Sequence, residues 1–139
     1  MKRKWYLDSG CSRYMTGDES QFITLEAKNG GMVTFGDNDK EKIIGISNIG
    51  ITPSTCIKNI LLVNGLKYNL LSISQLCDKS YKVIFESSMC IVTSPLDDST
   101  RFIGHRHGNV YIVDLDNLSI QNIQYLVAIN AKINETSWL

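Results

Sequence analysis

Short apolar runs separated by glycine, asparagine and aspartate are the dominant pattern along this chain. No apolar repeat of 3.6 residues lasts beyond about two turns, which favours strands over helices. The predicted strands are Trp5–Leu7, Phe22–Leu25, Gly31–Phe35, Lys42–Ile46, Ile49–Thr52, Ile57–Val63, Tyr81–Phe85, Cys90–Thr93 and Val110–Val113. Their number and spacing predict a mainly β fold, a small barrel or sandwich.

One hairpin is marked by its turn residues. Gly36-Asp37-Asn38-Asp39-Lys40 lies between Phe35 and Ile43, and these residue types tolerate positive φ or form Asx turns. We therefore expect the two flanking strands to pair, with the polar tip of the hairpin in solvent.

One segment has the pattern of a short helix. Residues 70–77 place Leu70, Ile73, Leu76 and Cys77 on one helical face, and Asn69 precedes them as an N-cap. This face is expected to pack into the core.

The residue composition changes at Asp114. After this residue, Asn, Gln and Ser are mixed with scattered Ile and Leu. We expect a barrel over residues 3–95, a strand extension to about Asp116, and a partly disordered end within a second region, 96–139. The residues expected to be buried are Tyr6, Leu7, Phe22, Val33, Phe35, Ile44, Ile60, Leu62, Leu71, Leu76, Val83 and Phe85.

Composition narrows the class of protein. The 139 residues suffice for one compact core, and 14 basic residues balance 14 acidic ones, so no net charge attracts nucleic acid or an anionic membrane. The four cysteines form no CxxC pair, which argues against a zinc ribbon or a redox dithiol and favours free thiols in a reducing compartment. We expect no metal and no cofactor.

The N-terminus gives no targeting signal. Met1-Lys2-Arg3-Lys4 is basic, but Trp5-Tyr6-Leu7-Asp8 follows instead of the apolar run of a signal peptide. No window approaches the ~20 apolar residues of a membrane span. A soluble, cytoplasmic protein without a membrane partner is expected.

The best candidate for chemistry is Asp8. It follows an apolar strand directly and precedes Ser9-Gly10, so a tight turn that the glycine makes possible would carry its carboxylate. An ordinary Asx turn is the alternative interpretation of these three residues.

Two carboxylates sharing one proton can hydrolyse a peptide, because one activates water while the other donates to the carbonyl oxygen. A second turn of this kind is not evident, since Asp97-Asp98-Ser99-Thr100 lacks the glycine. Such activity would therefore require a symmetric homodimer with one Asp8 from each chain.

The sequence around Asp8 resembles that of a known protein family. The run from Trp5 to Asp18, followed by Phe22, resembles the active-site strand and turn of copia-type retrotransposon Gag-Pol polyproteins. A second run, from Asn59 to Leu76, is similar to the strand, turn and helix of the same family. The resemblance implies a retropepsin-like β-barrel with one short α-helix, followed after residue 95 by the start of the linker that precedes integrase.

The resemblance also implies roles for individual residues. Asp8 would be the catalytic carboxylate of an aspartic endopeptidase that processes the polyprotein, and Ser9 and Gly10 would hold its turn. Asp37, Asn38 and Asp39 would lie in the flap that closes over a peptide substrate. His105-Arg106-His107 are expected to be solvated loop residues and not zinc ligands.

Some positions depart from the family pattern. Tyr14 stands where histidine is common, and Asn64 interrupts the apolar-apolar-Gly pattern before the helix. Only seven residues precede Asp8, where retroviral-type proteases have further strands, which predicts an open barrel edge and a weaker dimer. A non-catalytic β-barrel, a truncated or repurposed remnant of a retroelement, is therefore the alternative to the protease.

Overall fold

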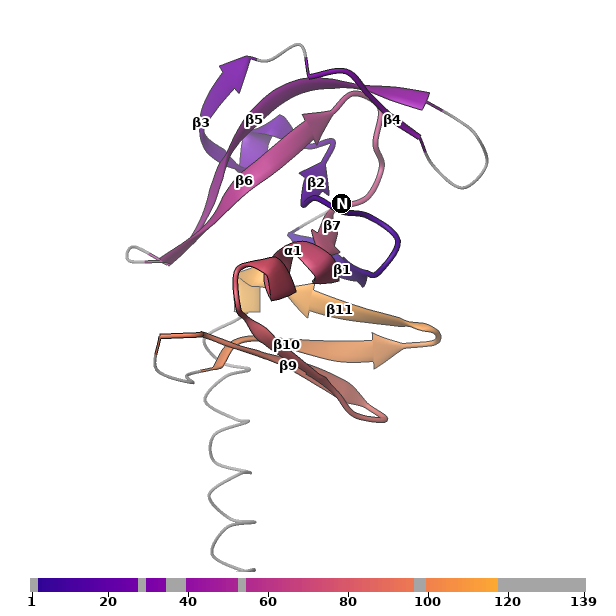
Figure 1. The fold of residues 1–139 in the computed structure, drawn as a ribbon, viewed down its shortest axis with the longest axis vertical. Helices are drawn as coiled ribbons and strands as arrows, with labels where there is room; N and C mark the ends of the chain where they lie inside the picture. The colour runs from indigo at the N-terminus through magenta and orange to yellow at the C-terminus, as the bar shows by residue number, and fades with distance from the viewer. Residues whose placement is uncertain (1–2, 28–29, 35–39, 53–54, 97–99, 118–139) are drawn as a thin grey trace, which may run out of the picture.

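Strands dominate the computed structural model, which describes residues 3–27, 30–34, 40–52, 55–96 and 100–117. The mainly β prediction with one short α-helix is confirmed (Figure 1). The elements are β1 Lys4–Asp8, β2 Met15–Thr16, η1 Glu19–Gln21, β3 Phe22–Ala27, β4 Met32–Thr34, β5 Lys40–Thr52, β6 Thr55–Val63, β7 Leu70–Ser72, α1 Ile73–Asp78, β8 Lys82–Phe85, β9 Met89–Thr93, β10 Thr100–His107, β11 Val110–Asp114 and η2 Leu115–Asn117. The helix is neither long nor apolar enough to cross a membrane, and the same holds for every helix in the described ranges.

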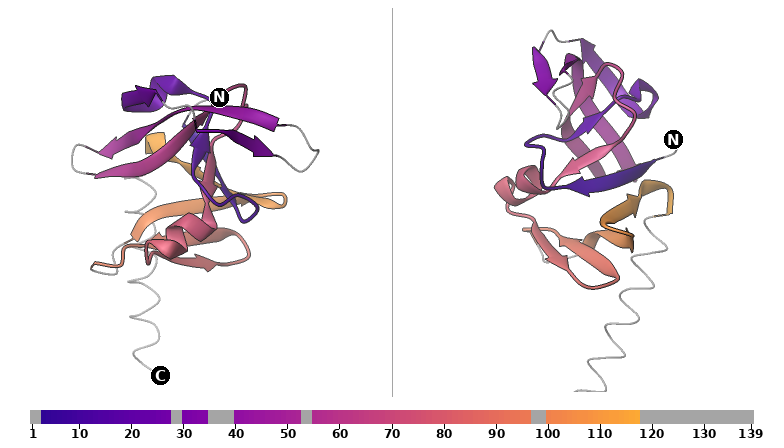
Figure 2. Two further views of the ribbon diagram at one scale, coloured as in Figure 1. Left: turned by 45° about the horizontal axis from the view of Figure 1, so that its top comes forward. Right: turned by 90° about the vertical axis from the view of Figure 1, so that its right-hand side faces the viewer.

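The described strands form one curled sheet. Its order is β3-β5-β6-β2-β7-β1-β11-β10-β9-β8, and β4 pairs with β5 beside this path. Figure 2 shows the two ends of the sheet as separate layers, with β1 crossing between them. The result is a small barrel-like domain in which β1 is a central strand.

The position of β1 follows from its alternating pattern. Trp5 and Leu7 are buried in the larger apolar cluster, whereas Asp8 is half-buried on the other face. On one side β1 pairs parallel with β7, where Asp8 lies opposite Ser72. On the other side it pairs antiparallel with β11, where Trp5 lies opposite Val113.

The predicted core is confirmed in part. The buried residues among those predicted are Leu7, Ile60, Leu62, Leu71 and Leu76, and the half-buried ones are Tyr6, Phe22, Val33 and Val83. Phe35 lies outside the described residues. Ile44 and Phe85 are 37% and 45% exposed, so these two predictions are wrong. Ile44 points away from the buried side of β5, and Phe85 lies on an edge strand.

The predicted start of the helix is wrong. Residues 70–72 form β7, and α1 begins at Ile73 with Ser72 as its N-cap, whose hydroxyl accepts a hydrogen bond from the Gln75 backbone N–H at 3.1 Å. Hydrogen bonding to β1 holds residues 70–72 extended, and Asn69 is fully buried in a different role.

Other elements differ from the prediction in extent. The two strands predicted within residues 42–52 are one strand, β5, which accommodates shifts of register against β6. β2 and β10 were not predicted, and β10 includes His105-Arg106-His107, which are exposed as expected but belong to a strand. The last strand of the sheet, β11, ends at Asp114, close to the expected end of the strand extension at about Asp116. The domain division at residue 95 stays a prediction, and the expected disordered end lies outside the described residues.

Candidate functional site

The turn after β1 is held by the carboxylate of Asp8. Its Oδ1 atom accepts a hydrogen bond from the backbone N–H of Gly10 at 2.6 Å, which makes the Asx turn that was the alternative interpretation of these residues. A Cβ atom on Gly10 would lie 3.2 Å from the same oxygen, so a side chain there would crowd the carboxylate. Ser9 and Gly10 are exposed.

The helix fixes the far end of this turn. The hydroxyl of Ser72 donates to the Cys11 carbonyl oxygen at 2.7 Å while it caps α1. The hydroxyl of Ser74 lies 3.3 Å from the same carbonyl oxygen. The Asp8 turn is therefore tied to the rigid start of α1, although α1 follows it by more than sixty residues.

Asp8 opens into a cavity of about 370 Å³. The lining residues are Asp8, Gly10, Cys11, Ser12, Met15, Val33, Thr34 and Leu70. Val33 and Thr34 belong to β4, the first strand of the predicted hairpin, which pairs with the first residues of β5. The candidate flap residues Asp37, Asn38 and Asp39 lie outside the described residues, but both strands that flank them are described. The cavity size falls within the range of small-ligand pockets.

Cys11 is a neutral thiol at the wall of this cavity. Burial raises its pKa to about 11, and the nearby charge of Asp8 adds to the effect. The thiol also lies 3.9 Å from the Asp8 carbonyl oxygen. A thiol whose pKa is raised in this way is mostly protonated near pH 7 and is therefore a weak nucleophile.

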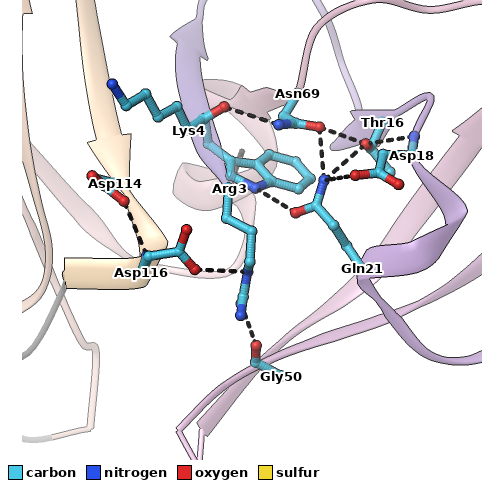
Figure 3. A network of polar contacts seen from close by, with 10 residues as sticks. Arg3, Lys4, Thr16, Asp18, Gln21, Gly50, Asn69, Asp114 and Asp116 are labelled. Atoms are coloured by element: carbon cyan, nitrogen blue, oxygen red, sulfur yellow. Dashed lines mark hydrogen bonds and ion pairs between the residues drawn. The ribbon is translucent and has the colours of Figure 1, made fainter. Parts of the chain in front are cut away.

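A polar network around the buried Asn69 side chain holds β1 (Figure 3). The Asn69 side chain accepts hydrogen bonds from the Thr16 hydroxyl at 2.6 Å and from Gln21 Nε2 at 3.0 Å, and it donates to the Lys4 carbonyl oxygen at 2.9 Å. Trp5 Nε1 donates to Gln21 Oε1 at 3.2 Å. Sequence analysis did not find this network, because its members lie on four separate segments.

Tyr14, which stands where the family pattern commonly has histidine, packs in the core. Tyr14 is buried, and burial raises the pKa of its phenol. Its ring centroid lies 5.3 Å from Lys79 Nζ, and both residues line a smaller cavity of about 200 Å³. Burial lowers the pKa of Lys79, and the charges of Arg13 and Lys58 lower it further.

Within the described part of the chain, Asp8 is the one carboxylate that lines this cavity. Asp97-Asp98, the other acidic sequence of interest, lies outside the described residues. Among the described residues, no three His, Cys, Asp or Glu side chains come together in a way that could hold a metal ion.

A curled sheet with an aspartate turn at the end of its central strand defines a small β-barrel-like domain with a single acidic candidate site. The family described as Pol polyprotein, beta-barrel domain, matches residues 5–81, which is more than half of the chain. The chain belongs to this family and is thus a domain of a retroelement polyprotein. Searches of curated proteins and of solved structures gave no match.

Proposed function

We propose that this domain supplies half of the active site of a homodimeric aspartic endopeptidase from a copia-type retrotransposon polyprotein. Asp8 is the catalytic carboxylate, and Ser9 and Gly10 hold its turn. The observation that supports this proposal best is the cavity in which Asp8 lies with Val33 and Thr34 of the hairpin strand β4. Polyprotein processing is the activity expected of such a site.

The chemistry requires two copies of Asp8. One carboxylate takes a proton from water while the other, protonated, donates to the scissile carbonyl oxygen, and two such groups in proximity share one proton. Asp8 is half-buried and its turn is exposed, so a second chain has access to it. The hydrogen bond from Gly10 to Oδ1 fixes the orientation of the carboxylate toward the cavity.

The substrate is an extended segment of the polyprotein. A cavity walled by Met15, Val33 and Leu70 fits an apolar side chain next to the scissile bond. Residues 37–39, between β4 and β5, close over the peptide as a flap and exclude bulk water.

A non-catalytic barrel is the second candidate. Its support is that Asp8 is the one carboxylate among the described residues that line the cavity, whereas the reaction needs two. In this case the domain binds a peptide or packs against neighbouring polyprotein segments.

The deciding experiment combines sedimentation with a cleavage assay on peptides that span the junctions of the parent polyprotein. The protease proposal predicts a dimer at micromolar concentration, inhibition by statine-type transition-state mimics, and loss of cleavage in Asp8→Asn. That variant keeps the Oδ1 acceptor for Gly10, so it stays folded. Asp78→Asn, an exposed change at the end of α1, is the matched control and retains activity. A strict monomer, or cleavage that survives Asp8→Asn, would contradict the protease and leave the non-catalytic barrel.

A further inference from the structure

β8 forms one edge of the described sheet. It ends the strand order and pairs with β9 alone. Two of its three apolar side chains are poorly covered, since Ile84 is 42% and Phe85 45% exposed. A short apolar edge strand of this kind is a template for pairing with another strand.

The hydrogen-bond alternation of the β8–β9 hairpin shows which backbone groups point outward. The backbone N–H of Glu86 donates to the Met89 carbonyl oxygen at 2.8 Å, so Glu86 faces β9. In an antiparallel ladder every second residue does the same, which places the N–H and C=O groups of Ile84 toward β9 as well. The N–H and C=O groups of Val83 and Phe85 therefore point away from the sheet.

The sequence of this edge is complementary to itself. Residues 82–86 read Lys-Val-Ile-Phe-Glu, with a positive charge at one end and a negative charge at the other. Lys82 and Glu86 are both exposed, and neither forms an ion pair within the described residues.

We propose that β8 pairs antiparallel with β8 of a second copy of this chain, about a two-fold axis at Ile84. Val83 then lies opposite Phe85 of the partner subunit, and these are the residues whose backbone groups point outward, so four hydrogen bonds form across the axis. Lys82 lies opposite Glu86 of the partner subunit in the closely spaced, non-hydrogen-bonded positions, where side chains interact best.

Other registers of the β8–β8 pairing are less favourable than the one centred on Ile84. A shift by one residue places outward backbone groups against inward ones, and it moves the side chains to the wrong faces. A shift by two residues restores the backbone bonds but separates Lys82 from Glu86 of the partner subunit. Charge complementarity thus selects the register centred on Ile84.

This contact is separate from the pairing that the Asp8 site needs. β9, β10 and β11 lie between β8 and β1 in the strand order, so β8 pairing leaves the Asp8 cavity open. The inference goes beyond the proposed function, and a domain that uses both contacts would assemble beyond a dimer.

The test is a charge exchange, measured as the dimer dissociation constant by sedimentation equilibrium in the Asp8→Asn background. Lys82→Glu and Glu86→Lys each turn two attractive cross-strand pairs into two repulsive ones, so each weakens the dimer roughly tenfold or more. The double variant restores the pairs with reversed polarity and returns the affinity to the wild-type range. High salt reduces all of these differences.

Lys67→Glu and Glu19→Lys are the matched controls, because both side chains are exposed and lie outside β8. They leave the dissociation constant unchanged. A monomer at every concentration would overturn the proposal. So would a dimer whose affinity is the same in both single variants, since that dimer would use another face. A monomer would also contradict the homodimeric protease, whereas a dimer that is insensitive to both single variants overturns the β8 pairing alone.

Discussion

The buried amide of Asn69 makes a sharp test of how β1 is held. Asn69→Ala removes the acceptor for Thr16 and Gln21 and the donor to the Lys4 carbonyl oxygen. Asn69 is fully buried, so water does not replace these partners. We expect a large decrease in the free energy of unfolding, because no other donor replaces Asn69 at the Lys4 carbonyl oxygen.

The magnitude follows from the three lost hydrogen bonds. Each contributes about 0.5–1.5 kcal/mol net, and an unsatisfied buried group costs about 1–3 kcal/mol. Gln21 Nε2 also contacts Asp18 Oδ2 at 3.4 Å and keeps part of its hydrogen bonding. The expected loss is about 3–5 kcal/mol, a large share of the 5–15 kcal/mol that typical domains have.

Urea unfolding followed by far-ultraviolet circular dichroism measures this loss. Asn64→Ala is the matched control, because Asn64 is an exposed loop residue, and its effect is expected within about 0.5 kcal/mol. If Asn69→Ala lost less than about 1 kcal/mol, the network would not stabilise β1 and the reasoning would be refuted.

Two further predictions concern a close backbone contact and the buried thiols. Gly17→Ala places its Cβ 1.8 Å from the Leu66 carbonyl oxygen, so the backbone must move and the free energy of unfolding should fall by more than about 3 kcal/mol in urea titrations. Burial raises the pKa of both Cys11 and Cys90 to about 11, from 9.0. Because these pKa values are higher in the folded state, the stabilisation present below pH 9 is lost as the pH rises from 9 to 11, which urea unfolding at pH 8 and pH 10.5 detects.

Each of these predictions has an internal control. Gly108→Ala meets no atom within 4 Å and carries only the cost of a positive φ, about 1–2 kcal/mol. A Cys11→Ser, Cys90→Ala double variant should lose most of the decline in stability between pH 8 and pH 10.5. A decline of unchanged size would assign it to other groups.

Local signals were sufficient for the Asp8 turn. An apolar strand followed by Asp-Ser-Gly predicts that β1 ends in a tight turn at Asp8, and the structure has this turn. The turn chemistry around residues 36–40 likewise predicts the pairing of β4 with β5. These features depend on neighbours in sequence, which is why they could be predicted.

Contacts between segments distant in sequence explain why some elements were predicted wrongly or missed. Residues 70–72 have a helical pattern, but parallel pairing with β1, more than sixty residues away, makes them a strand and moves the N-cap to Ser72. β10 has a polar end and lacks clean alternation, and it becomes a strand because β9 and β11 pair with it on both sides. The meeting of Asp8 with Thr34 in one cavity has the same long-range origin.

The place of β1 between β7 and β11 determines when its two edges can be paired during translation. β1 is made first, yet its second pairing partner is complete only at Asp114. At about 5–20 residues per second, translation of the intervening residues takes roughly 5–20 s. During this interval Asp8 sits on a strand with an unfilled edge. β1 therefore gains its second neighbouring strand only after residues 110–114 have been synthesised.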